Sequence, residues 1–266
     1  MAEAPSRKNP ERVAVVTGAS SGIGLLTSIE LAKAKFHVIA SMRDVTRRSR
    51  LDEAAKSAGV TGRIDVRALN VTNFDAIPEF VSQIIRDYKR IDVLVNNAGF
   101  NGHYSLIKDM PLAHWRETIE INLTGTMLVT RTVLPFMLDR KAGAIVTTAS
   151  NVARRGLPYR ADYVCSKWAL LGFTQTLALE VASQNIRVNA VCPGPIEGDR
   201  IEDVMAHHAR IEGKSVADVR REWEATPMNR FVEPQEVAAA MLFLCSSDAS
   251  AMTGQAINVT GGFIMT

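Results

Sequence analysis

The chain of 266 residues has little cysteine, a small net charge and no apolar run long enough to span a membrane. Its three cysteines, Cys165, Cys192 and Cys245, are widely spaced and form no C-x-x-C pair. A disulfide framework is therefore not indicated, and we expect the reduced thiols of a cytoplasmic protein. The five histidines show no metal-ligand spacing, so we predict no metal site.

Charge and hydropathy also argue against two kinds of partner. The formal charge of +3 comes from 31 basic and 28 acidic residues, a near balance that does not favour nucleic acid. The apolar stretch 237–245 is too short to cross a bilayer, and the first eleven residues lack the apolar core of a signal peptide. We expect neither nucleic acid nor a membrane as a partner.

Short apolar runs alternate with segments of helical periodicity. Strands are predicted over 13–16, 36–40, 64–69, 91–95, 144–148, 187–191 and 256–259. Helices are predicted after the first strand and over about 45–58, 74–88, 112–138, 161–182 and 237–245. The polar stretch 194–226 has a weaker helical pattern. This alternation implies right-handed βαβ crossovers and a parallel sheet with helices on both faces.

Nothing in the sequence divides the chain into separate units, because it has no linker, repeat or low-complexity block. We predict a flexible N-terminal tail over residues 1–10. A single α/β domain with a doubly wound parallel sheet is predicted over residues 11–266. Sheets of this kind bind ligands outside the carboxyl ends of their strands.

The first predicted strand ends in Thr-Gly-Ala-Ser-Ser-Gly-Ile-Gly, residues 17–24, and leads directly into a helix. Glycine permits a tight turn and a close approach of a pyrophosphate, and the helix N-terminus favours that anion. The spacing G-x-x-x-G-x-G in this setting predicts a dinucleotide site. Gly18-x-Ser20-x-Gly22 also matches the nucleophile elbow of α/β-hydrolases. That alternative needs a late histidine, and none follows His208.

Tyr163 and Lys167 lie four residues apart at the start of a predicted helix, so they share one face. A nearby ammonium favours the phenolate and lowers the tyrosine pKa, which suits a general acid or base. This spacing is common by chance, and a surface pair is the alternative reading. Ser150 closes the preceding strand, thirteen residues before Tyr163, at the same sheet edge. Asn122 is a polar residue in the middle of a predicted helix.

With these segments the sequence resembles the classical short-chain dehydrogenase/reductase family from about residue 13 to 262. The matching segments, in chain order, are 17–24, 96–99 (Asn-Asn-Ala-Gly), Asn122, Ser150, Tyr163 with Lys167, Pro193-Gly194, 253–255 and Gly261-Gly262. The resemblance implies a single Rossmann-like domain. It also implies hydride transfer between a nicotinamide and a carbonyl or alcohol.

The resemblance implies a role for each matching residue. Tyr163 exchanges a proton with the substrate oxygen, and Lys167 lowers its pKa and binds the nicotinamide ribose. Ser150 orients the reacting oxygen, and Asn122 holds a water that links Lys167 to solvent. Residues along the cofactor are Gly18, Ser20, Ser21, Ile23 and Gly24 at the pyrophosphate and adenosine end, Asn70 and Val71 near the adenine, Asn97, Ala98 and Gly99 along its length, and Pro193, Gly194 and Ile196 at the nicotinamide.

The residue that ends the second strand distinguishes the two nicotinamide cofactors. Met42 stands where NAD-preferring members carry Asp, and Arg43 follows it, which suits a 2′-phosphate. We therefore favour NADP(H), with Arg47 as an additional cation. Asp44 could pair with Arg43, and Ser21 stands where many NADP-type members carry a basic residue, so NAD(H) stays open.

On the substrate side the family places a lid over about 195–228, and Gly198 replaces a threonine common there. One hypothesis is an anionic substrate, based on the positive charges of Arg154, Arg155 and Arg200. The alternative is that these are ordinary surface arginines that face water. We predict an NADP(H)-dependent oxidoreductase that acts on a small-molecule carbonyl or alcohol. An NAD-dependent alcohol dehydrogenase of the same fold is the first alternative, and a non-catalytic nucleotide-binding regulatory protein the second. Helices 112–138 and 161–182 are expected to form a homotetramer or homodimer.

Overall fold

Seven parallel strands form one sheet in the computed structural model, which describes residues 12–266. The tail predicted for residues 1–10 lies outside the described residues. The sheet order is β3-β2-β1-β4-β5-β6-β7. The strands are β1 (Val13–Thr17), β2 (His37–Met42), β3 (Ile64–Ala68), β4 (Val93–Asn96), β5 (Gly143–Thr148), β6 (Ile186–Pro193) and β7 (Ala256–Val259). All seven predicted strands are present, with ends shifted by a few residues.

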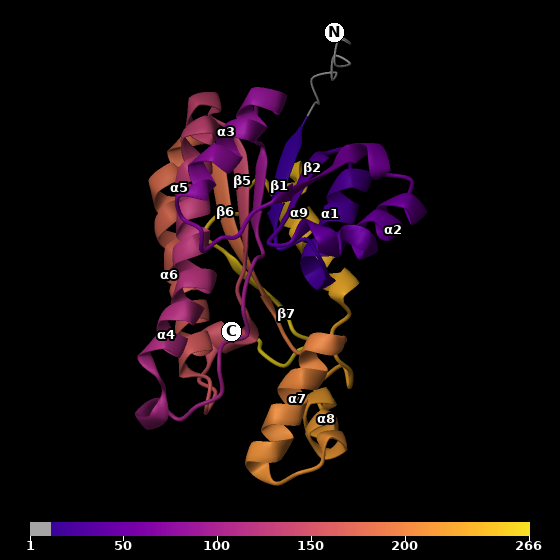
Figure 1. Cartoon of the computed structure of the whole chain (residues 1–266), viewed down its shortest axis with the longest axis vertical. Coiled ribbons are helices and arrows are strands. Elements are labelled where there is room, and N and C mark those ends of the chain that lie inside the picture. Colours follow the sequence, from indigo (N-terminus) through magenta and orange to yellow (C-terminus); the bar gives the residue numbers. More distant parts are fainter. Residues whose placement is uncertain (1–11) are drawn as a thin grey trace.

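Helices cover both faces of this sheet, as Figure 1 shows. One face carries α1 (Gly22–Lys33), α2 (Ser49–Ser57) and α9 (Pro234–Cys245). The other carries α3 (Ala76–Tyr88), α5 (Gly125–Arg140) and α6 (Ala161–Val181). The strand order reverses between β1 and β4, which confirms the predicted doubly wound fold.

The core consists of two large layers, one on each side of the sheet. Successive side chains of a strand point to opposite faces. Val16 therefore packs with Leu31 and Met241, while its neighbour Val15 packs on the opposite side with Ile84. Because both faces are covered, β1 is fully buried, which explains its continuous apolar sequence.

The helix predicted over 112–138 is present as one helical run, Leu112–Arg140, but it is not regular throughout. The chain forms α4 (Leu112–Ile119), a π-helical turn at Glu120–Thr124 and α5. Asn122 lies in the π turn, and its side chain bonds the backbone of Phe100. A π turn inserts one residue into the helical repeat and often marks a functional site. The predicted helix over 45–58 likewise begins with a separate 3-10 turn, Val45–Arg48, capped by the Asp44 side chain.

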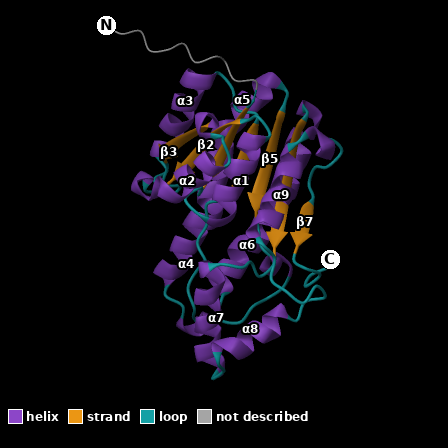
Figure 2. Cartoon of the chain, turned by 90° about the vertical axis from the view of Figure 1, so that its right-hand side faces the viewer, coloured by secondary structure: helices purple, strands orange, loops and turns teal. Residues whose placement is uncertain are grey.

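Two amphipathic helices follow β6 and lie beyond the carboxyl ends of the strands (Figure 2). They are α7 (Asp199–Glu212) and α8 (Val216–Glu224), and Gly213 ends α7 in the left-handed region at φ +67°. Met205 and Val219 bury their apolar sides against Phe231. The weak helical pattern of this polar stretch thus corresponds to a helical hairpin with its own small core.

One helical run of the described chain, Leu112–Arg140, is long and apolar enough to cross a membrane by length and composition alone. Val129, Val133 and Met137 of this run are fully buried in the layer next to the sheet. Of the most apolar window of this run, 39% is buried.

Candidate active site

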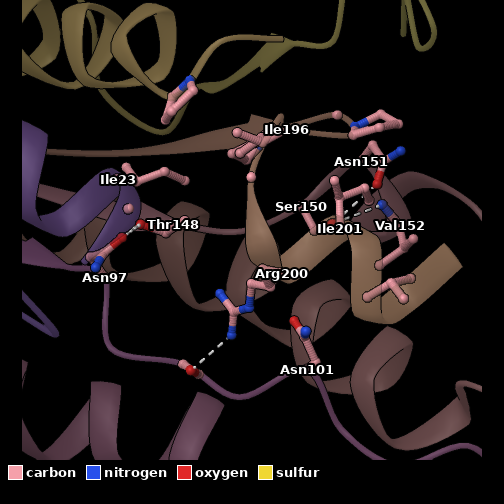
Figure 3. A pocket seen from close by; sticks show the side chains of 18 of the residues that line it. Ile23, Asn97, Asn101, Thr148, Ser150, Asn151, Val152, Ile196, Arg200 and Ile201 are labelled. Atoms are coloured by element: carbon pink, nitrogen blue, oxygen red, sulfur yellow. Dashed lines mark hydrogen bonds between the residues drawn. The ribbon is translucent and has the colours of Figure 1, made fainter. Parts of the chain in front are cut away.

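A cleft of about 960 Å³ opens at the carboxyl ends of β1, β4, β5 and β6. Figure 3 shows that Ile23 of α1 and Ile196 after β6 line it, and that Arg200 reaches across it. The structure brings most of the predicted site residues to this cleft: Gly18, Ser20, Ser21, Ile23, Asn97, Ala98, Gly99, Ser150, Tyr163, Lys167, Pro193, Gly194 and Ile196.

Five predicted residues do not line the cleft: Gly24, Arg43, Asn70, Val71 and Asn122. Asn70 uses its side-chain oxygen to accept hydrogen bonds from the amide and hydroxyl of Thr72, at 3.2 and 2.9 Å. Val71 is buried and packs against Gly125. Neither side chain contacts the cleft as folded, so their predicted contact with an adenine remains a prediction.

The turn after β1 and the segment after β4 are joined by a compact hydrogen-bond network. The Thr17 hydroxyl accepts from the backbone N–H groups of Asn97 and Ala98, both at 3.0 Å. The Asn97 amide donates to the carbonyls of Thr17 and Gly18, at 3.1 and 3.0 Å. This network fixes the position of the turn after β1 relative to the segment after β4.

The same turn has the shape that a pyrophosphate needs. Gly18 has φ +69°, and a Cβ there would lie 2.8 Å from the Ala98 Cα. Ser21, Gly22 and Ile23 begin α1 and line the cleft, so the unsatisfied N–H groups of the helix N-terminus face it. The residues present therefore fit a dinucleotide.

The segment after β2 carries an exposed cation, the guanidinium of Arg43. Met42 is buried, whereas Arg43 is exposed. Asp44 bonds the amide and hydroxyl of Thr46 at 3.0 and 2.6 Å, and these bonds hold the pKa of its carboxyl below the ordinary value. Within residues 12–266, Arg43 has no ion pair with Asp44 or another carboxylate. The guanidinium is thus available for a phosphate.

Lys167 is a buried cation directly beside the catalytic candidate Tyr163. Its side chain is 5% exposed, and its Nζ donates to the Thr148 carbonyl at 2.8 Å. Nζ lies 5.7 Å from the centre of the Tyr163 ring. Burial lowers the pKa of the Lys167 ammonium, although Tyr163 opposes this shift.

Opposing effects act on the phenol of Tyr163. Burial alone raises its pKa, but the positive charges of Lys167 and Arg200, hydrogen bonding with Ser150 and the charge of Arg160 together outweigh burial. The pKa of Tyr163 therefore lies below its ordinary value. A phenol in this state can take up or release a proton closer to neutral pH.

Ser150 and Asn122 are held in place by their own hydrogen bonds. The Ser150 hydroxyl caps the turn after β5, accepting from the Val152 amide at 3.3 Å and donating to Asn151 Oδ1 at 3.1 Å. The Asn122 amide donates to the Phe100 carbonyl and the Ser166 hydroxyl, at 2.9 and 3.0 Å. Asn122 thereby fastens the segment after β4 to α6.

Sequence reasoning missed two buried charged residues at the start of α6. Asp162 is fully buried and accepts from the backbone amides of His103 and Tyr163, at 2.9 and 2.7 Å. Arg160 is 2% exposed and lies against the Tyr163 ring. An acidic residue in the first turn stabilises many helices through the helix dipole. Its presence in the sequence therefore does not indicate that Asp162 is buried or which groups it contacts.

A family model described as enoyl-(acyl carrier protein) reductase matches residues 18–264. The chain belongs to the short-chain dehydrogenase/reductase family. This confirms the predicted family, and with it an oxidoreductase that acts on C=O or CH–OH groups with a nicotinamide cofactor.

Relatives of this family align over nearly the whole chain. A 3-oxoacyl-[acyl-carrier-protein] reductase from Thermotoga maritima is 40% identical over 96% of this chain and 98% of its own. A putative ketoacyl reductase from Streptomyces coelicolor is 38% identical over 94% and 96%.

Two solved structures have the same fold. The actinorhodin polyketide ketoreductase with NADPH has a TM-score of 0.89 and 37% identity, covering 94% of this chain and 96% of its own. NAD⁺-bound xylitol dehydrogenase has a TM-score of 0.89 and 30% identity, covering 96% and 100%. The NADPH-bound ketoreductase supports the NADP(H) preference predicted from Arg43, and the NAD⁺-bound enzyme keeps NAD(H) as the alternative.

Proposed function

We propose that this protein uses NADPH to reduce the keto group of a 3-oxoacyl thioester. The observation that carries the proposal is the group of Tyr163, Lys167 and Ser150 that lines the cleft, with the Lys167 Nζ 5.7 Å from the centre of the Tyr163 ring. The relatives named as 3-oxoacyl and ketoacyl reductases support this substrate class. Phe100, Val152, Leu157, Ile201 and Phe263 supply an apolar wall on which an acyl chain can lie.

Each of four residues has a separate role in the proposed reduction. The nicotinamide, when bound, supplies the hydride. Ser150 hydrogen-bonds the keto oxygen, and the Tyr163 hydroxyl gives that oxygen a proton as negative charge develops on it. The Lys167 ammonium stabilises the resulting phenolate, and Asn122 keeps the segment 99–100 in place beside Lys167.

We place the lid at residues 195–228. Arg200 donates to the Gly99 carbonyl at 3.1 Å, which joins α7 to the segment after β4 across the cleft. Arg50 lies 3.8 Å from Asp199 and joins α2 to α7 in the same way. Both contacts are made by exposed side chains. Exposed contacts of this kind contribute little free energy, so they can break when a ligand enters.

The assembly we propose is a cytoplasmic homotetramer or homodimer built through α5 and α6. Trp168 is 50% exposed and Leu179 is 86% exposed on α6, where they present apolar area to a partner. Light scattering coupled to gel filtration tests this state. A monomer, or an oligomer that Leu179→Glu leaves unchanged, would contradict the proposed interface.

The substrate proposal is tested with 3-oxoacyl thioesters of a short cysteamine carrier and with neutral ketones, each with NADPH and NADH. We expect the thioesters to have the highest kcat/KM and NADPH to be preferred. A preference for 2-enoyl thioesters, or the absence of turnover across the whole panel, would overturn the proposal. Cofactor binding without any turnover would instead support the regulatory alternative.

A further inference from the structure

Arg160 is a buried cation enclosed between two tyrosine rings. Its side chain is 2% exposed, and its guanidinium carbon lies 4.4 Å from the centre of the Tyr104 ring and 4.8 Å from that of Tyr163. One terminal nitrogen donates to the Tyr104 hydroxyl at 2.7 Å, and the other donates to the Asn101 carbonyl. The guanidinium thus contacts both the segment after β4 and the catalytic tyrosine.

No carboxylate of the described residues compensates this charge at ion-pair distance, in contrast to the guanidinium of Arg67, which pairs with Asp65 and Asp87. The nearest acid along the chain, Asp162, already accepts from His103, Thr118 and Tyr163. The Nε of Arg160 is also buried without a partner. A buried cation without a counter-ion costs free energy, and this cost needs an explanation.

We propose that Arg160 is a positioning residue for the reaction, which holds the ring of Tyr163 and favours the phenolate over the phenol. The inference rests on the proposed role of Tyr163 as general acid and base. A guanidinium above an aromatic face is attracted to it even when the ring is neutral, and the attraction grows when the ring carries negative charge. The phenolate of Tyr163 is thus an anion that can compensate the charge of Arg160.

The other groups that face the Tyr163 phenol come from several elements. Lys167 lies on the same helix, Arg200 on α7, and the Ser150 hydroxyl after β5. These groups add to the effect of Arg160, so its removal shifts the tyrosine pKa upward without restoring the ordinary value.

The second ring beside Arg160 connects this site to the lid. Tyr104 stacks on His207 of α7 with ring centres 4.5 Å apart and planes 11° apart, and His208 approaches the same ring edge-on at 6.0 Å. Burial lowers the pKa of His208, and Arg160 lowers it further. Both effects favour the neutral form of the His208 imidazole beside Arg160.

The test compares Arg160→Met and Arg160→Lys over a range of pH, in both directions of the reaction. Alcohol oxidation needs the phenolate and carbonyl reduction needs the phenol. In the pH–rate profiles of Arg160→Met, we expect two midpoints to rise together by about one pH unit. One is the midpoint of the acidic limb, below which oxidation slows, and the other is the midpoint of the alkaline limb, above which reduction slows. At a pH below both pKa values this shift slows oxidation about tenfold. The KM for NADPH stays within about twofold, and Arg160→Lys recovers most of the shift.

Arg187→Met is the matched control, because Arg187 is half-buried and donates to the carbonyls of Leu244, Ser246 and Ala249 away from the cleft. We expect this variant to lower the melting temperature and leave both pH limbs unchanged. Unchanged limbs in Arg160→Met, or equal shifts in Arg187→Met, would overturn the proposal.

A second measurement separates this inference from the proposed function. Ultraviolet titration of tyrosinate, with Tyr163→Phe subtracted, gives the pKa of Tyr163 without any turnover. A higher pKa in Arg160→Met supports the inference even if the proposed substrates fail. An unchanged pKa refutes it, whatever the activity.

Discussion

Gly24 lies so close to Asn97 that a Cβ on the glycine would sit 2.3 Å from the Asn97 amide nitrogen. The same Cβ would lie 2.3 Å from the Gly18 carbonyl oxygen. The first turn of α1 therefore packs directly against the turn after β1 and the segment after β4. Gly24 does not line the cleft itself, and its lack of a side chain permits this close approach.

The first prediction concerns this contact. Gly24→Ala forces the helix and the turn apart, which we expect to cost about 1–3 kcal/mol of stability and at least about tenfold in NADPH affinity. Thermal unfolding and a fluorescence titration with NADPH measure the two effects. Gly62→Ala is the control, since a Cβ at Gly62 meets no atom within 4 Å. Native-like NADPH affinity in Gly24→Ala would refute the packing argument.

Tyr163→Phe removes the hydroxyl and retains the ring against Arg160. Because this variant loses the proton donor only, we expect turnover to fall about 100- to 10,000-fold while NADPH binding is kept. Steady-state kinetics and an NADPH titration measure both quantities. Normal activity would contradict the assignment of Tyr163 as general acid.

Cofactor preference is expected to depend on Arg43. Charged hydrogen bonds contribute roughly 1.5–3 kcal/mol, so Arg43→Ala should lower kcat/KM with NADPH by about ten- to one-hundredfold. The value with NADH should change by less than about twofold, because NADH lacks the 2′-phosphate. Arg48→Ala is the control, since Arg48 pairs with Asp52 at 2.7 Å. An equal loss with both cofactors would exclude Arg43 as the phosphate ligand.

A pH-dependent contribution to stability is expected from Glu236 at the start of α9. Hydrogen bonds from Arg230 and from the Glu233 amide lower the pKa of this carboxyl to about 2. A lowered carboxyl pKa means that the contribution is complete above the ordinary value of 4.5 and is lost as the pH falls toward 2. Since the pair is 42% exposed on both sides, solvent screening limits the contribution to about 1 kcal/mol.

Urea unfolding of Glu236→Gln at pH 7 and pH 3 tests this expectation. The stability difference from the native protein should be present at pH 7 and smaller at pH 3. Glu53→Gln is the control, because Glu53 is exposed and has no ion pair in the described part of the chain. A difference that is the same at both pH values would show that the capping geometry, and not the charge, stabilises α9.

Sequence reasoning located the elements and the motif residues better than the local details of the helices. The strands were predictable because their continuous apolar runs reflect burial on both faces. The π turn at Asn122 was not, because one inserted residue hardly changes the periodicity of a long helix. Likewise, Asp44 was a candidate partner of Arg43 until the structure showed it bonded to Thr46.

The amino-acid order was sufficient to predict the parallel sheet, and to predict that the glycine turn, Tyr163 and Lys167 lie at one cleft. Such features depend on residues that are close in the sequence, or on burial, which is reflected in the apolar composition of a segment. The tertiary structure was required for the surroundings of that pair: the Thr148 carbonyl on Lys167, Arg200 across the cleft, and Arg160 between two tyrosines. The electrostatic environment of Tyr163 sums charges from segments up to dozens of residues apart, and only the folded chain brings them together.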